Sequence, residues 1–117
     1  MTEKWQRYYY RHREFHLERN REYYLSRMAQ WWEWFAELGQ NKCQECGYDR
    51  HPKALDWHHR DPKDKVIDIG KFINGRQCNE ANKTVLLEEI EKCDRLCACC
   101  HRIRHFDIAN EKHTYKG

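Results

Sequence analysis

Four cysteines stand in two Cys-x-x-Cys pairs, a spacing that is typical of a structural zinc site. Cys43 and Cys46 form the first pair, and Cys97 and Cys100 form the second pair fifty residues later. Each pair can present two thiolates to one ion, and two such pairs complete a closed tetrahedral cage. We therefore expect one structural Zn²⁺ here. The other cysteines are expected to lie outside this cage: Cys78, Cys93 and Cys99.

Three histidines are spaced so that they could hold a second, chemically active ion. His101 and His105 are four residues apart, so in a helix they lie one turn apart on one face. His101 directly follows the cage residue Cys100, and His58 stands near the end of a predicted strand. Three imidazoles leave coordination positions open, which is typical of a catalytic rather than a structural metal site.

A short strand over residues 54–59 is expected to position His58. Its alternation places Leu55 and Trp57 on the core side and Asp56 and His58 on the opposite side. The Asp56 carboxylate therefore shares a face with His58, where it could hold a ligand imidazole in one tautomer or bind the ion itself.

The other elements of the same region follow from turn signals and hydrophobic spacing. Gly47 falls where the backbone must turn after the second cysteine of a tight knuckle. A brief strand near residues 95–96 leads into a final helix over residues 97–110. The segments between the two zinc knuckles are expected to be an extended piece over 66–69, a polar loop over 70–83 and a helix over 84–92.

Residues 1–40 contain no proline and predict one long helical arm that ends at Gly39. In its first half, arginines such as Arg7 and Arg11 are interleaved with aromatic side chains, a mixture suited to phosphate contacts and stacking. The helix could equally be a solvated surface or a dimer contact. Its second half carries an apolar stripe: Tyr24, Met28, Trp31, Phe35 and Leu38.

Composition limits the class of protein. The chain has 117 residues, and its net charge is only +3 although 35% of its residues are charged. Any attraction to DNA must therefore come from the local placement of arginines. No apolar run is long enough to cross a bilayer. The odd cysteine count and the charged N-terminus, which lacks the pattern of a signal peptide, favour the reducing cytoplasm. So small a hydrophobic core usually needs additional stabilisation, which we expect a metal ion to supply here.

Taken together, these motifs resemble those of the HNH endonucleases. The resemblance covers roughly residues 43–106 and rests on three motifs: Cys43-x-x-Cys46-Gly47, Leu55-Asp56-Trp57-His58-His59 and Lys92-Cys93-x-x-Leu96-Cys97-x-x-Cys100-His101-Arg102-x-x-His105. It implies an α+β fold with a zinc-stapled, treble-clef-like ββα-metal core, a nuclease domain over residues 41–110 and a C-terminal tail over 111–117. The motifs look closest to compact phage-type enzymes, which would act in the host cytoplasm.

The resemblance also implies a role for each histidine. His58, His101 and His105 would bind a divalent ion (Mg²⁺, Mn²⁺, Ni²⁺ or Zn²⁺), and His59 would be the general base that activates water. Adjacent strand residues point in opposite directions, so His58 can face the ion while His59 faces the incoming phosphate. The nearest cations for contacting DNA phosphates are Arg60, Arg102 and Arg104.

The sequence departs from the family pattern at the asparagine that gives HNH its middle letter. Lys92 and Cys93 occupy the place where many members carry this residue. Three asparagines further upstream are alternatives for its supporting role: Asn74, Asn79 and Asn82.

The predicted activity is hydrolysis of DNA phosphodiester bonds. A monomer with one site would nick one strand, whereas a homodimer formed through the N-terminal helix could cut both strands. Two alternatives are a noncatalytic zinc-finger module that binds DNA and, from another class, an RNA-cleaving toxin. No membrane partner is expected.

Overall fold

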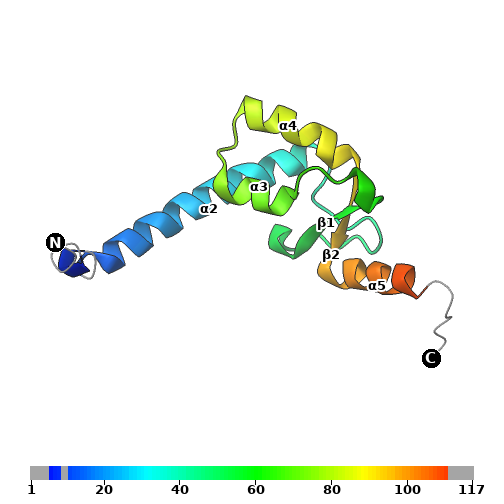
Figure 1. The fold of residues 1–117 in the computed structure, drawn as a ribbon, viewed down its shortest axis with the longest axis horizontal. Helices are drawn as coiled ribbons and strands as arrows, with labels where there is room; N and C mark the ends of the chain where they lie inside the picture. The colour runs from blue at the N-terminus through cyan, green and yellow to red at the C-terminus, as the bar shows by residue number, and fades with distance from the viewer. Residues whose placement is uncertain (1–5, 9–10, 111–117) are drawn as a thin grey trace.

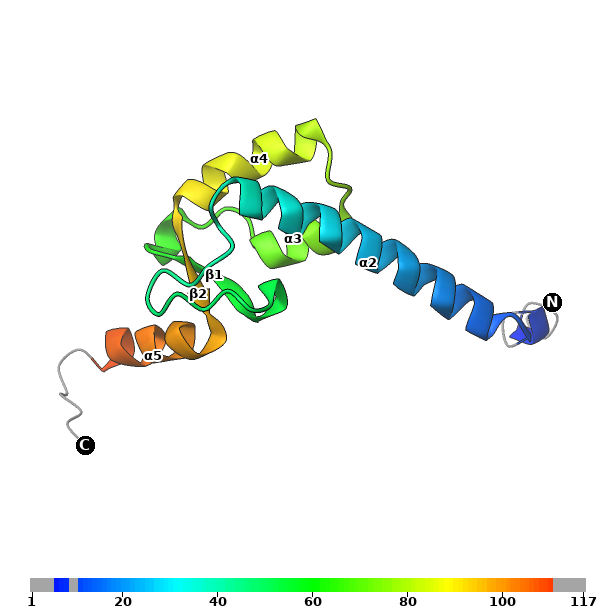
Figure 2. The ribbon, with the colours of Figure 1, turned by 180° about the vertical axis from the view of Figure 1, so that it is seen from behind.

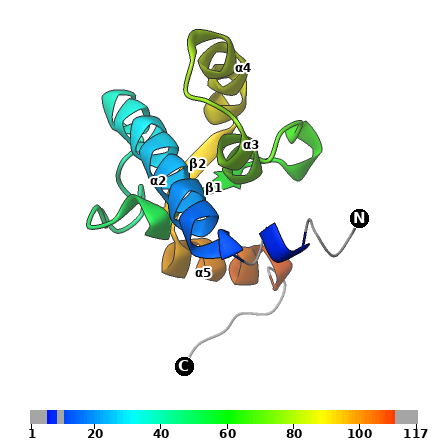
Figure 3. The same ribbon diagram turned by 90° about the vertical axis from the view of Figure 1, so that its left-hand side faces the viewer.

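Two antiparallel strands lie between one C-terminal helix and a group of three other helices (Figure 1). This arrangement comes from a computed structural model, which describes residues 6–8 and 11–110. Strand β1 (Leu55–His59) pairs with β2 (Cys93–Cys97), so that Leu55 faces Cys97 and His59 faces Cys93. Helix α5 (Ala98–Ala109) lies on the opposite side of the strands from helices α2 (Arg13–Glu37), α3 (Ile69–Gly75) and α4 (Glu80–Glu91) (Figure 3).

Helix α2 (Arg13–Glu37) confirms a long helix over most of the range expected for the arm, although it begins only at Arg13, after a turn at His12. Its first half projects away from the rest of the fold (Figure 2). The helix ends at Glu37 with Leu38 as its cap, and Gly39 follows with a φ of 75°, a left-handed conformation that glycine adopts without strain. The predicted apolar stripe is partly confirmed: Met28, Trp31 and Phe35 are buried, whereas Leu38 is exposed.

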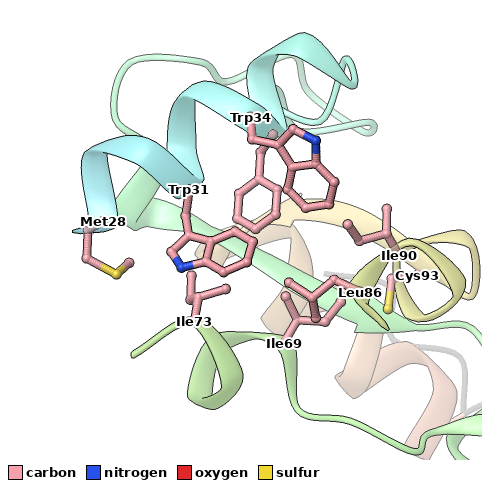
Figure 4. Packing of buried hydrophobic residues seen from close by; sticks show 9 residues of the cluster. Met28, Trp31, Trp34, Ile69, Ile73, Leu86, Ile90 and Cys93 are labelled. Atoms are coloured by element: carbon pink, nitrogen blue, oxygen red, sulfur yellow. The ribbon is translucent and has the colours of Figure 1, made fainter. Parts of the chain in front are cut away.

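The second half of α2 forms one hydrophobic core with the two following helices and β2 (Figure 4). Trp31 has no exposed surface and packs edge-on against Trp34, with ring centroids 5.7 Å apart. Because the buried residues of the apolar stripe pack within their own chain, a dimer formed through α2 would need another face of the helix. The buried members of this core are Met28, Trp31, Trp34, Phe35, Ile69, Ile73, Leu86, Ile90 and Cys93.

The segment expected to be a polar loop over residues 70–83 contains most of one helix and the start of another, so that prediction is wrong. Of the piece expected to be extended over 66–69, residues 66–68 are outside any helix or strand, and only Ile69 is helical. Helix α3 (Ile69–Gly75) begins after Asp68, whose carboxylate accepts a hydrogen bond from the Lys71 amide. Helix α4 (Glu80–Glu91) begins after Asn79 in the same way, four residues before the expected start at residue 84. These side-chain caps stabilise short polar helices, and burial of one face of each helix supplies the rest.

The coarse fold class is confirmed as a small α+β domain. The strand expected at 54–59, the strand near 95–96 and the final helix all form, with the bounds given above. Short 3₁₀ turns at Pro52–Ala54 and Pro62–Asp64 flank β1. Among the described residues no helix is both long and apolar enough to span a membrane. The predicted tail over 111–117 lies outside the described residues, and the predicted domain boundary near residue 40 stays a prediction.

Candidate functional site

The four predicted cage cysteines come together from three parts of the chain. Cys43 and Cys46 lie in the loop after α2, Cys97 ends β2, and Cys100 lies in the first turn of α5. Their sulfur atoms all lie within 4.8 Å of one another, and the Sγ atoms of Cys46 and Cys97 are 3.7 Å apart. A tetrahedral Zn²⁺ with bonds of about 2.3 Å separates its sulfur ligands by about 3.8 Å. The cluster therefore fits a zinc ion.

The backbone around the cage is arranged to stabilise thiolates. The amides of Cys46 and Cys100 each point at the sulfur three residues earlier, at 3.5 Å, and Gly47 makes the turn with a φ of 78°. Burial would raise the pKa of Cys43, but hydrogen bonds from the backbone lower it to about 6. The pKa of Cys100 is instead raised, chiefly by its hydrogen bond with Cys97. Four sulfurs this close can all ionise only if a cation sits among them.

The three predicted metal-binding histidines also meet, beside the cage. His58 on β1 faces His101 and His105 on α5, with ring centroids 5.2 Å and 5.0 Å away. The Nε2 atoms of His101 and His105 are 2.9 Å apart, and one nitrogen from each of the three rings lies within 4.8 Å of the others. Nitrogen ligands of one divalent ion stand about 3 Å apart, so this group fits an ion as well.

The environment of His58 keeps it in the form that binds metals. Its side chain is buried, at 5% exposure. Burial lowers its pKa, and the nearby His101, His105 and Arg104 lower it further. At neutral pH His58 is therefore neutral, with a lone pair available for an ion.

Asp56 lies where the strand alternation predicted, on the same side as His58. Its Oδ2 atom is 3.1 Å from Nδ1 of His101. A carboxylate in this position fixes the imidazole with its proton on Nδ1 and directs Nε2 toward the other histidines. The contact supports Asp56 as the residue that orients a ligand rather than as a ligand itself.

His59 points away from the three histidines and contacts a carboxylate that the sequence analysis missed. Its Nε2 lies 2.6 Å from Oε2 of Glu89 on α4, and Glu89 is only 2% exposed. Glu89 also accepts hydrogen bonds from the Val66 amide and from Nζ of Lys92. Burial would raise the pKa of Glu89, but these bonds, with that of His59 first among them, lower it to about 2. The Glu89 carboxylate is therefore ionised where it meets the His59 ring.

A signal for Glu89 was present in the sequence. Leu86 and Ile90 are one helical turn apart and lie on the buried face of α4, and position 89 falls on that face. A carboxylate on a buried helix face needs a partner, because an unpaired buried charge costs several kcal/mol.

Among the described residues none of the three candidate asparagines makes a hydrogen bond to His59. Asn79 caps α4, and the side chain of Asn82 donates a hydrogen bond to the Gln77 carbonyl. The Asn74 carbonyl accepts a hydrogen bond from Arg27. The side chain that supports His59 in this structure is instead Glu89, which lies one helical turn before Lys92.

The predicted DNA-contacting arginines differ in their surroundings. Arg60 pairs with Asp94 at 3.0 Å, and Arg104 pairs with Asp94 at 2.6 Å and with Glu45. Their charges are thus partly neutralised within the chain. The side chains of three others are exposed to solvent: Arg7, Arg11 and Arg102.

The Glu89 pair predicts a specific loss of stability in acid. The pKa of Glu89 is about 2 in the folded chain against an ordinary value of 4.5, so its contribution is complete above about pH 5 and is lost between pH 4.5 and 2. At pH 7 it amounts to about 3 kcal/mol. In urea unfolding, we expect the gap between wild type and Glu89→Gln to narrow by about 1 kcal/mol from pH 7 to pH 3.5.

The matched control is Glu88→Gln, which changes the exposed neighbour on the same helix. It should unfold like the wild type at both pH values. Loss of zinc in acid affects all three proteins alike. A gap between wild type and Glu89→Gln that stays constant or widens at pH 3.5 would contradict the account.

Comparison of the chain with protein-family models, with curated proteins and with solved structures gave no match. The assignment of a function therefore depends on the side chains and their geometry.

Proposed function

We propose that the protein is a metal-dependent endonuclease of the HNH class that hydrolyses DNA phosphodiester bonds. The single observation that carries this proposal is the arrangement around β1. His58 faces two further histidines, which fit a divalent ion, while the next residue, His59, faces the opposite way against a buried carboxylate. A metal-binding trio beside a paired histidine supplies the two parts that phosphodiester hydrolysis needs, an electrophile and a base.

In this proposal His59 is the general base. Its Nε2 is held by Glu89, so Nδ1, which makes no hydrogen bond to any described residue, is the atom that takes a proton from the attacking water. The ionised Glu89 stabilises the imidazolium that results and keeps the ring in one orientation. Water attacks phosphorus opposite the 3′-oxygen, so the products carry a 5′-phosphate and a 3′-hydroxyl.

His58, His101 and His105 would hold the divalent ion. Such an ion acts as a Lewis acid that stabilises negative charge on the phosphate and the departing oxygen. Asp56 fixes His101 through Nδ1, at 3.1 Å. The zinc cage contributes position rather than chemistry, because Cys100 and His101 are consecutive in α5 and an ion that fixes the first also fixes the second.

Cleavage of supercoiled plasmid tests the proposal through its dependence on the histidine trio. Zinc-loaded wild type should nick or linearise plasmid when Mg²⁺, Mn²⁺ or Ni²⁺ is added. His105→Ala should lose about 100-fold or more in rate, since it removes one ligand from the exposed end of the trio while the cage stays intact. Isothermal titration should show weaker binding of the added ion to this variant.

His16→Ala on α2 serves as the histidine control and should cut at the wild-type rate. If the wild type shifts DNA in a gel but never cuts it with any of these ions, the protein is a noncatalytic zinc module. If it degrades RNA and spares DNA, the RNA-cleaving alternative holds.

A further inference from the structure

A groove of about 550 Å³ runs from the histidines along the inner side of α2. Its walls come from α2, the turn at Pro52–Ala54, β1 and α3. Asp56, His59 and His101 line it, so the groove opens directly onto the proposed catalytic site. A substrate that reaches His59 therefore has a continuous surface beyond it on which to lie.

The groove carries more positive than negative charge. Four cationic side chains line it, against two carboxylates, those of Asp56 and Asp68. Since the net charge of the whole chain is only +3, this is a local concentration of positive charge next to the site. The four cationic residues are Lys53, Lys65, Lys71 and Arg95.

Arg95 is the most informative of these residues, because it is buried without a carboxylate partner. Only 3% of its surface is exposed. Nε donates to the Gln40 carbonyl and Nη1 to the Leu55 carbonyl, and the guanidinium lies over the ring of Trp57 at 4.1 Å. Within the described part of the chain Nη2 makes no hydrogen bond and no carboxylate forms an ion pair with Arg95, although the Asp56 carboxylate acts on it at longer range. A buried cation of this kind favours an anion at the surface that it lines.

Aromatic side chains complete the groove. Trp57 lies against Arg95, and its ring also meets the ring of Phe35 edge-on at 5.0 Å. Trp32 is half-buried on α2 and contacts the His51 ring at 5.8 Å. A positively charged groove with aromatic side chains along it is the arrangement by which proteins hold unpaired nucleotides.

We propose that this groove binds unpaired nucleotides of the strand that enters the catalytic site, with backbone phosphates against Arg95, Lys53 and Lys71 and a base against Trp32. The choice of DNA as the strand rests on the proposed function. A space of about 550 Å³ suits a ligand the size of one or two nucleotides, not the width of a duplex. A paired base could enter only after it had left its stack.

Fluorescence anisotropy with a labelled 15-nucleotide DNA strand and its duplex tests this proposal. The zinc-loaded full chain is used without any added divalent ion, so binding is measured apart from cleavage. We expect the single strand to bind more tightly than the duplex. Trp32→Ala should weaken single-strand binding about 5-fold or more, and Trp32→Phe should restore most of it. The double variant Lys53→Ala, Lys71→Ala should make the salt dependence of single-strand binding less steep, with the magnitude of the slope of log K (the association constant) against log salt concentration reduced by about 1.4.

Lys63→Ala is the matched control, because this exposed lysine lies outside the groove. It should leave single-strand binding unchanged. Equal affinities for Trp32→Ala, the lysine double variant and Lys63→Ala would overturn the groove proposal, as would duplex binding that is tighter than single-strand binding. The two proposals can fail separately. Binding that depends on the groove, without any cleavage, would contradict only the proposed nuclease activity. Plasmid cleavage, with binding that does not depend on the groove residues, would contradict only the groove proposal.

Discussion

Removal of zinc from the four-cysteine cage is expected to unfold the strands and α5. The hydrophobic cluster around the cage is small, and its buried members are Cys43, Leu55, Leu96 and Cys97. Two of these four are leucines and two are cage cysteines, so little apolar surface remains to hold the knuckles together without the ion. Structural Zn²⁺ supplies on the order of 10 kcal/mol of apparent folding energy, comparable to the whole stability of a small domain.

Circular dichroism and thermal melting before and after chelation measure this effect. The chelated protein should lose its cooperative melting transition, and added Zn²⁺ should restore it. Cys97→Ser should behave like the chelated protein, whereas Cys99→Ser should melt like the wild type, because Cys99 is exposed and outside the cage. An unchanged melting curve after the zinc has been stripped would show that the cage is not structural.

Replacement of His59 is expected to have the largest effect on cleavage. Removal of a general base costs typically about 10²–10⁴-fold in rate, and His59→Ala should fall in this range. The three histidines proposed to hold the ion are untouched by the substitution, so the affinity for the added ion should stay near that of wild type. KM for DNA should also change little, because the base acts in the chemical step.

Glu89→Gln should give an intermediate loss, because Glu89 acts through His59. A neutral amide cannot stabilise the imidazolium, and we expect the rate to fall about 10- to 100-fold at an unchanged KM. Glu89→Asp should recover part of this loss if the carboxylate can still reach His59, whereas Glu88→Gln should cut at the wild-type rate. Equal activity of Glu89→Gln and Glu88→Gln would limit Glu89 to a purely structural role.

The parts of the site that could be predicted from sequence are those fixed by short spacing. A Cys-x-x-Cys pair and a pair of histidines four residues apart define local geometry, so the two clusters could be named before their surroundings were known. The strand alternation placed Asp56 and His58 on one face for the same reason, and the 3.1 Å contact between Asp56 and His101 agrees with it.

The parts that could not be predicted depend on long-range packing. Glu89 meets His59 from thirty residues away, and nothing in the local pattern around either residue identifies the other. The region over residues 70–83 is polar in composition, and α3 and the start of α4 depend on the core that they form with α2 in addition to their side-chain caps. The surroundings of Arg95 arise only in the folded chain, where its guanidinium meets the carbonyls of Gln40 and Leu55 and the ring of Trp57.

The most direct test of the central claim is single-turnover cleavage of supercoiled plasmid by zinc-loaded wild type and His59→Ala, side by side, with Mn²⁺ or Ni²⁺ added. Nicked and linear products separate on the same gel, so the assay also reports whether one or both strands are cut. We predict that the wild type cleaves the plasmid and that the cleavage rate of His59→Ala is lower by about 10²-fold or more, while this variant still folds and binds the added ion. Equal cleavage by the two proteins would contradict the account.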